Sequence, residues 1–202
     1  MLSGHEICKE IKSGNSADPE SIAVVPNPDL KALELSGESS VTLRLGRWFL
    51  TFRQSSETHL ETVPGTAVNE NKISKSYFIP FGTVFVLHPG RFVLASTLEW
   101  IRVPRKYAAV VVGKSTLGRR GIVIETAAGV HPGFTGCLTL EVANVGEVPV
   151  RLTAGMPFCQ LFFHSLEGKL SESKSSFSSQ RKPRLGQLRD DLILSRLLKT
   201  RR

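Results

Sequence analysis

Residues 113–121, GKSTLGRRG, combine side chains that could bind an anion. A lysine, two hydroxyl residues and two arginines lie between glycines, directly after the apolar stretch YAAVVV. Glycines let a backbone approach an anion closely, and hydroxyl and cationic groups can hold phosphate oxygens. The spacing is not that of a Walker A loop, which reads GxxxxGK[ST]. The segment therefore indicates a phosphate-binding turn, with an ordinary solvated turn as the alternative.

A glutamate in the strand-like segment CLTLEVANVG is a candidate functional residue. Leu138 and Leu140 point to one side of a strand, and Thr139 and Glu141 point to the other. If both faces of the strand are buried, Glu141 is a costly buried charge unless it is paired or functional. The alternative is that Glu141 lies on a solvated face of the sheet.

The cysteines and histidines do not form a metal-binding or disulfide pattern. Cys8, Cys137 and Cys159 are odd in number and no two form a CxxC pair, which argues against a disulfide framework and a zinc knuckle. His59-Leu60-Glu61 fits the H-x-E half of the zinc deaminase pattern, but the P-C-x-x-C half that supplies the cysteine ligands does not occur. We therefore expect a reduced protein without a metal site. The histidines are scattered at positions His5, His59, His88, His131 and His164.

The distribution of charge divides the chain into a body and a tail. Residues 1–168 carry 16 basic and 15 acidic side chains, whereas residues 169–202 carry 10 basic and 3 acidic. The net charge of +8 therefore comes mostly from the tail, which has a single aromatic residue, Phe177, and lacks the aromatic interleaving of single-strand binders. We expect a domain over 1–168 and a basic tail over 169–202, either solvated or closing over a triphosphate. Binding of nucleic acid is the less favoured reading.

The remaining global signals predict a cytoplasmic protein. No run approaches the roughly 18 to 20 apolar residues of a membrane span. The N-terminal sequence MLSGHEICKEIKSG also lacks the apolar core of a secretory signal. We therefore expect no membrane partner.

Short apolar runs separated by Gly and Pro turns predict an all-β barrel or sandwich. Alternation in VTLRLG indicates a half-buried strand, and Gly46 indicates a bulge in it. The polar residues 54–76 predict a long exposed loop. Helical spacing predicts a short N-terminal helix ending near Gly14 and a short C-terminal helix within 188–202.

Taken together, these motifs resemble the core of the dCTP deaminase family, relatives of the trimeric dUTPases. Family members carry a G[RK]S[ST]xxRxG segment, an xPGFxGxxTLExxN strand pair and a PxxLxxGMxxxQLxF ending. Counterparts occur here in the same order as GKSTLGRRG, HPGFTGCLTLEVAN and VPVRLTAGMPFCQLFF. The resemblance covers roughly residues 41–166, and the combination is more specific than any one motif.

The resemblance implies a zinc-independent deaminase with the dUTPase-like distorted β-barrel (β-clip). By it, Glu141 takes a proton from the water that attacks C4 of cytosine and later protonates the departing amino group. Ser115 helps to hold the water, and Arg119 tunes the charge around the glutamate. It further implies a homotrimer with shared sites and Mg²⁺ bound with the triphosphate. The implied substrate-contacting residues are Lys114, Ser115, Thr116, Leu117, Gly118, Arg119, His131, Thr139, Leu140, Glu141, Gln160, Lys182 and Gln187.

Three positions depart from the family pattern. Thr42 stands where the family strand VDLRLG has an aspartate. The loop before Phe134 is one residue shorter than usual, and His131 stands where an aspartate contacts the sugar 3′-hydroxyl. In dUTPases the equivalent aspartate activates water, so His131 makes hydrolysis of dUTP less favoured. The tail offers Phe177, Lys182 and Gln187 only as loose counterparts of the family's Lys-Tyr and Gln-Gly signature.

The leading hypothesis is deamination of dCTP to dUTP and ammonia, in the supply of dUMP and dTTP. The alternatives are a bifunctional deaminase and diphosphatase that gives dUMP, and a catalytically silent nucleotide-binding regulator of the same fold. A nucleic-acid-binding β-barrel rests on the charge of the tail alone.

Overall fold

Strands are the main regular structure of the chain. A computed structural model describes residues 1–13, 18, 20–57, 59–60, 62–63, 70–124, 127–168, 179–186 and 190–199. The predicted all-β class, with an N-terminal helix and a C-terminal tail, is confirmed. The elements are α1 (Gly4–Ser13), β1 (Ala23–Val25), α2 (Leu30–Leu35), β2 (Val41–Phe52), α3 (Glu70–Ile73), β3 (Ser74–Phe78), β4 (Val84–Leu87), β5 (Phe92–Thr97), β6 (Trp100–Arg102), β7 (Tyr107–Gly113), α4 (Ser115–Gly118), β8 (Ile122–Ile124), β9 (Gly129–Val130), β10 (Thr135–Gly136), β11 (Thr139–Asn144), β12 (Val150–Thr153), β13 (Pro157–Ser165) and α5 (Leu192–Lys199).

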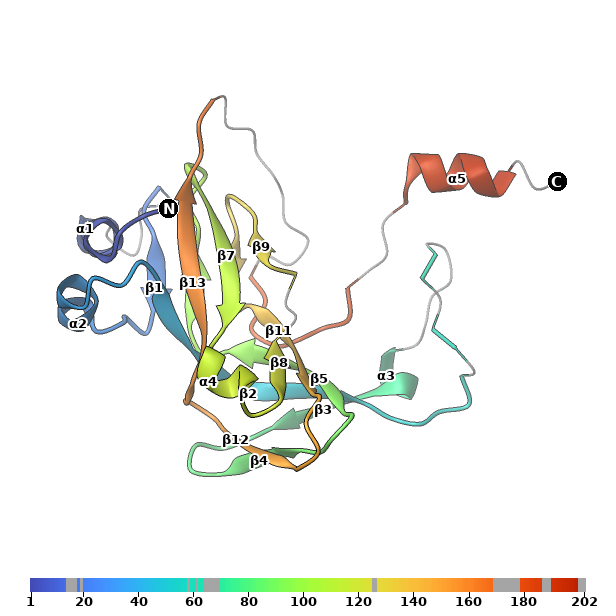
Figure 1. Ribbon diagram of the computed structural model, residues 1–202. Helices are drawn as coiled ribbons and strands as arrows, with labels where there is room; N and C mark the ends of the chain where they lie inside the picture. The colour runs from blue at the N-terminus through green and yellow to red at the C-terminus, as the bar shows by residue number, and fades with distance from the viewer. Residues whose placement is uncertain are drawn as a thin grey trace.

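The largest sheet curls into a half-barrel around the long strand β2 (Figure 1). Its strand order is β8-β11-β5-β2-β13-β7-β9, and β3 also pairs with β2. Two smaller sheets, β1-β6-β10 and β12-β4, complete the body. β2 pairs with β13 along its first half and with β5 and β3 along its second half.

A bulge in β2 lets one strand serve both halves of this sheet. The register with β5 shifts between Leu45 and Phe49, as the sequence predicted at Gly46. A Cβ on Gly46 would lie 2.6 Å from the Ser96 carbonyl oxygen, so only glycine allows this approach of the two backbones. After the shift, β2 continues to pair with β5, which in turn pairs with β11, the strand that carries Glu141.

The core fills the inside of the curled sheet. Phe49, Phe158 and Phe163 are fully buried, and burial of one such side chain contributes about 1.5–3 kcal/mol. Within the described ranges, no helix is both long and apolar enough to cross a lipid bilayer.

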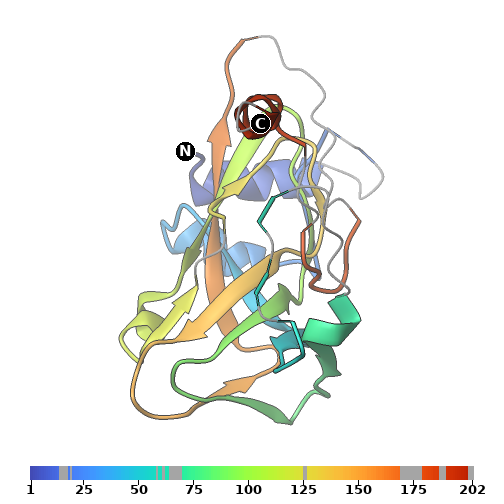
Figure 2. The same ribbon diagram turned by 90° about the vertical axis from the view of Figure 1, so that its right-hand side faces the viewer.

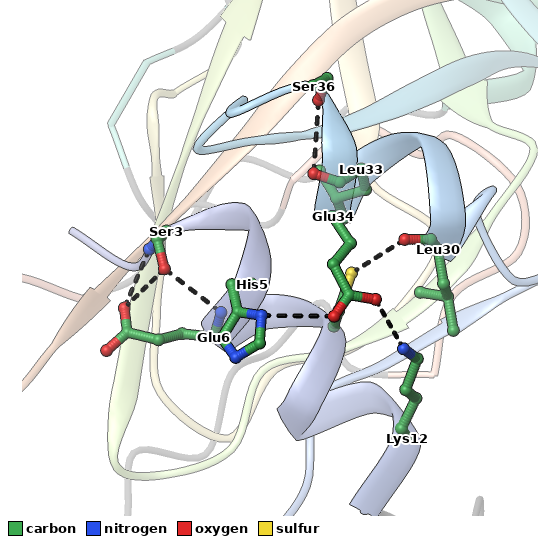
Figure 3. A network of polar contacts seen from close by, with 9 residues as sticks. Ser3, His5, Glu6, Lys12, Leu30, Leu33, Glu34 and Ser36 are labelled. Carbon is green, nitrogen blue, oxygen red and sulfur yellow. Dashed lines mark hydrogen bonds and ion pairs between the residues drawn. The ribbon is translucent and has the colours of Figure 1, made fainter.

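The two N-terminal helices lock together by polar contacts at one side of the sheet (Figure 3). α1 ends at Ser13, which confirms the predicted end near Gly14. Ser3 Oγ accepts a hydrogen bond from the Glu6 amide, and Glu6 Oε2 accepts one from the Ser3 amide, as in a capping box. Glu34 of α2 then accepts a hydrogen bond from Lys12 at 2.8 Å and faces His5 at 3.3 Å.

One sequence prediction was wrong in part. Residues 54–76 were expected to be an exposed loop, but α3 and the start of β3 lie within them. β3 reads SKSYF and pairs only with β2 at the edge of the sheet, so most of its side chains are exposed. An edge strand of this kind carries too few apolar residues to give the alternation of a half-buried strand.

The predicted C-terminal helix is confirmed as α5, which stands away from the body in Figure 1. Its apolar residues Leu192, Ile193 and Leu197 are exposed.

Candidate functional site

Glu141 lies on strand β11 with its side chain on the less buried face. Leu140 and Val142 are fully buried, whereas Thr139 and Glu141 are half-buried. The predicted alternation of the strand is therefore confirmed. The position of Glu141 falls between the two alternatives, since it lies neither in the core nor on an open surface.

The neighbouring strands give Glu141 an apolar surround. In the ladders, Glu141 lies opposite Leu94 of β5, and Leu94 lies opposite Leu50 of β2. Directly paired residues share a face of a sheet, so these three side chains form one row. Leu94 and Leu50 are buried, although they point away from the inner core. A carboxylate beside such a surface is less hydrated than one in open solvent.

The predicted phosphate segment forms the turn between β7 and β8. Lys114 takes an extended conformation before the single helical turn α4, and Arg120 Nη1 donates a hydrogen bond to the Thr116 carbonyl. The side chains of Ser115, Thr116 and Arg119 are exposed, as is Gly118. Leu117 is buried, so a ligand could meet this residue only through its backbone.

Two of the predicted substrate-contacting residues meet beside the altered strand position. Lys114 Nζ donates a hydrogen bond to Thr42 Oγ1 at 3.1 Å. Thr42 lies opposite Gln160 in the ladder of β2 and β13, and Gln160 Nε2 donates to Ser40 Oγ at 3.0 Å. The structure therefore groups Lys114 and Gln160 around Thr42.

The Lys114 group and Glu141 are supported by different parts of the sheet. α4 leads into β8, whose Ile122 pairs with Asn144, three residues beyond Glu141. Lys114 donates its side-chain hydrogen bond to Thr42, and Arg120 donates one to the Thr116 carbonyl.

Asn144 fixes the end of β11 and the turn after it, and sequence analysis missed this role. Its fully buried side chain donates hydrogen bonds to the carbonyls of Leu87 and Val148 and accepts one from the Gly146 amide. The sequence did contain a signal for this role: Asn144 stands at a position where the alternation of β11 predicts burial, and a buried polar side chain must form hydrogen bonds.

His131 lies in the tight turn that follows β9. Its carbonyl accepts a hydrogen bond from the Phe134 amide, and Gly133 has a φ of 79° that favours glycine. The imidazole is exposed. Glu125, in the same predicted loop, lies outside the described residues.

The tail returns to the face of the sheet that carries Glu141. The Cys137 amide donates to the Gln180 carbonyl at 2.8 Å, and Lys182 Nζ lies 3.9 Å from the centre of the Trp48 ring. Trp48 is two residues along β2 from Leu50, on the same face. Of the predicted tail residues, Lys182 is therefore near this face, whereas Phe177 and Gln187 lie outside the described residues.

A buried ion pair supports the start of β11 and was also missed. Glu99 is 1% exposed and accepts hydrogen bonds from the Arg44 amide at 2.8 Å and from its guanidinium at 3.4 Å. Burial raises the pKa of Glu99. Thr97 Oγ1 donates to the Glu99 carbonyl and accepts from the Leu138 amide, which connects this pair to β11. The charge within the apolar stretch LASTLEWIRVP was the available signal.

The described residues contain no group of three or more His, Cys, Asp or Glu side chains close enough to share a metal ion. All three cysteines are free thiols. Burial raises the pKa of Cys159 to about 12.

Comparisons with known proteins show to which family the chain is similar. Residues 1–166 match the family described as dCTP deaminase-like. A Corynebacterium glutamicum protein named "dCTP deaminase, dUMP-forming" is 38% identical over 162 residues, which cover 80% of this chain and 78% of the relative. A Natronomonas pharaonis protein named "dCTP deaminase" is 34% identical over 197 residues, covering 95% and 96%.

A solved structure shows the same fold. The crystal structure of 2′-deoxycytidine 5′-triphosphate deaminase from Agrobacterium tumefaciens superposes with a TM-score of 0.59 at 21% identity. The match covers 85% of this chain and 49% of that one, so this chain spans about half the length of the solved chain. The likeness confirms the predicted dUTPase-like fold. From its sequence and its fold, the chain belongs to the dCTP deaminase-like family.

Proposed function

We propose that this protein hydrolyses the amino group of dCTP to give a uracil nucleotide and ammonia. The observation that carries the proposal is the family match over residues 1–166, a range that retains Glu141, Ser115 and Arg119 together. Retention of all three favours an active enzyme over a silent nucleotide-binding regulator.

In the proposed reaction, Glu141 moves the protons. Its carboxylate takes a proton from water, and the resulting hydroxide adds to C4 of the cytosine ring. Glu141 then returns the proton to the amino group, the C4–N bond breaks and ammonia leaves. The proton of the added hydroxyl moves to N3 of the ring as the C4 carbonyl forms. Ser115 orients the water, and Arg119 balances the negative charge near Glu141. The backbone of Thr139 and Leu140 meets the edge of the base. No zinc ion takes part in this proposal.

The triphosphate would bind at the turn around α4. Lys114 and Arg119 supply positive charge there, and Ser115 and Thr116 supply exposed hydroxyl groups. This set suits phosphate oxygens, and Mg²⁺ bound with the triphosphate would neutralise part of its charge and draw its ligands from phosphate and water. Gln160 lies opposite Thr42, the hydrogen-bond partner of Lys114, in the ladder of β2 and β13. The basic tail would close over the bound nucleotide.

We further propose that each active site is completed by a second copy of the chain within a homotrimer. Support comes from the family resemblance, which implies a homotrimer whose neighbouring subunits share each site. A neighbouring subunit that brings its α4 turn to this β11 would join the carboxylate to the serine and arginine.

The expected end product is dUMP. The relative from C. glutamicum carries the name dUMP-forming, which favours the bifunctional alternative over release of dUTP. A second candidate, release of dUTP, is favoured by one observation. His131 occupies the exposed turn where the family resemblance places a water-activating aspartate. An imidazole is a weaker match for that role than a carboxylate.

A single incubation tests these statements. Purified protein is mixed with dCTP and Mg²⁺, ammonia is assayed, and the nucleotides are separated by chromatography. Ammonia with dUMP and pyrophosphate supports the bifunctional enzyme, and ammonia with dUTP supports the second candidate. Calorimetric binding of dCTP without any product would replace the proposal with the silent regulator.

A further inference from the structure

The tail segment 179–186 makes direct backbone contacts with the strand before Glu141. The Ser179 amide donates to the Thr135 carbonyl at 2.6 Å, and Gln180 forms a parallel bridge with Gly136. Figures 1 and 2 both show this part of the tail beside the strands that lead into β11. Backbone contacts therefore dock the tail on the body at Thr135 and Gly136.

Gly136 makes this docking possible. Its φ is 137°, and a Cβ at this position would lie 3.0 Å from the Gln180 carbonyl oxygen and 3.1 Å from its nitrogen. A side chain here would therefore push the tail away. Gly136, the second glycine of the PGFTG motif, is therefore required for the tail to approach the strand this closely.

An aromatic platform holds the next part of the tail. The Lys182 ammonium lies 3.9 Å from the centre of the Trp48 ring, and Trp48 packs on Phe78 with ring centres 4.9 Å apart. The Arg47 guanidinium lies between Phe78 and Phe81, at 4.3 and 4.6 Å from their centres. Pro183 is buried next to Lys182 in sequence. Trp48 therefore packs against Phe78, and one face of its ring contacts Lys182 of the tail.

We propose that Trp48 is a positioning residue for the tail. By binding the Lys182 ammonium over its ring, Trp48 orders residues 179–186 against the Glu141 face before nucleotide arrives. Closing the tail over a nucleotide costs conformational entropy of the tail. If Trp48 already orders the tail in the free enzyme, less of this cost falls on the binding step, and the nucleotide binds more tightly without touching Trp48. Trp48 would affect KM for dCTP much more than kcat.

Only the kinetic test of this inference depends on the proposed function. The first test therefore measures docking of the tail without any nucleotide. In a Trp100→Phe background, the remaining tryptophan, Trp48, reports on the tail by its fluorescence. Lys182→Met keeps the length of the side chain but removes the charge. Lys75→Met is the matched control, since Lys75 lies 4.9 Å over Tyr77 on the neighbouring strand β3. Thermolysin cleavage within residues 169–202, followed by mass spectrometry, measures docking of the tail.

Lys182→Met should change the Trp48 emission and speed cleavage of the tail roughly three- to thirty-fold, whereas Lys75→Met should do neither. Trp48→Ala should speed cleavage by a similar factor, and Trp48→Phe by less because it keeps a ring. Equal cleavage in Lys182→Met, Trp48→Ala and the control would overturn the proposal.

The kinetic test separates the two proposals. If the wild-type protein deaminates dCTP, Trp48→Ala should raise KM by a similar factor, with kcat changed less than about twofold. An active enzyme whose KM ignores Trp48 would overturn the positioning role and leave the proposed function standing. A wild-type protein without activity, but with Trp48-dependent cleavage, would refute the proposed function and leave the docking of the tail supported.

Discussion

Lys114 donates a hydrogen bond from Nζ to Oγ1 of Thr42 over 3.1 Å, and this contact anchors the proposed phosphate-binding turn on strand β2. A threonine hydroxyl orients the ammonium but brings no negative charge. An aspartate, which the family pattern has at this position, would orient Lys114 and also neutralise it. With Thr42, the full charge of Lys114 remains available to an anionic ligand.

Thr42→Val should therefore weaken nucleotide binding. The variant keeps the shape of the side chain but removes the acceptor for Lys114, so the ammonium loses its fixed position. We expect KM for dCTP to rise about three- to tenfold with little change in kcat, because the interaction acts on ground state and transition state alike. Steady-state ammonia release at several dCTP concentrations measures both constants.

Thr51→Val is the control for this prediction. Thr51 lies on the same strand, and its hydroxyl donates to the Lys75 carbonyl at 3.4 Å rather than to the proposed site. If both variants raise KM equally, the effect comes from strand β2 as a whole and the role of Thr42 is refuted.

Glu141→Gln should remove turnover while the protein still binds dCTP. The amide has nearly the same size as the carboxylate but cannot accept and return a proton. We expect kcat to fall by about 10²- to 10⁴-fold, with the calorimetric affinity for dCTP changed only a few-fold. Glu147→Gln, in the exposed turn after β11, is the control and should keep full activity. A Glu141→Gln protein that fails to fold would instead assign Glu141 a structural role.

The strands that carry this site were predictable because their signals are local. Alternation in CLTLEVAN sets the faces of β11, and Gly46 marks the bulge in β2. Both features depend on the geometry of a few consecutive residues. The position of Glu141 between core and surface was not predictable, because it depends on Leu94, Leu50 and the returning tail.

Contacts between distant segments were the part that the sequence could not give. Thr42 and Lys114 are 72 residues apart, and the sequence indicated an altered position at Thr42 without its partner. Trp48 meets Lys182 only because the tail folds back across the sheet. β3 was missed for a different reason, since an exposed edge strand has the composition of a loop.

His131→Asp should increase the share of dUMP among the products. A carboxylate in the turn after β9 could activate the water that attacks the α-phosphate of dUTP, as the dUTPase resemblance implies. We expect the ratio of dUMP to dUTP to rise while ammonia release stays within about threefold of wild type. Chromatography of timed samples measures the ratio. His131→Asn is the control, because it changes the side chain without adding a base. If the asparagine variant shifts the ratio equally, loop shape rather than a carboxylate determines the product.

The buried Glu99 should make the stability of the protein depend on pH. Burial raises its pKa above the ordinary value of 4.5, so the folded state binds a proton more tightly than the unfolded state does. The contribution of Glu99 to stability is therefore fully present below pH 4.5 and is lost as the pH rises through the raised pKa. Glu99→Gln cannot ionise, and it should remove this decline. Urea unfolding at several pH values from roughly 4.5 to 8 measures the slope for each protein.

Glu6 provides a control of opposite sign. The hydrogen bond from the Ser3 backbone lowers the pKa of Glu6, so its contribution is present above pH 4.5 and is lost as the pH falls through the lowered pKa. Glu6→Gln should therefore change the slope of stability against pH on the acid side alone, and leave the slope above pH 4.5 as in wild type. If Glu99→Gln and wild type show the same decline above pH 4.5, the Arg44 contacts offset burial fully and Glu99 is ionised in the folded protein throughout that range.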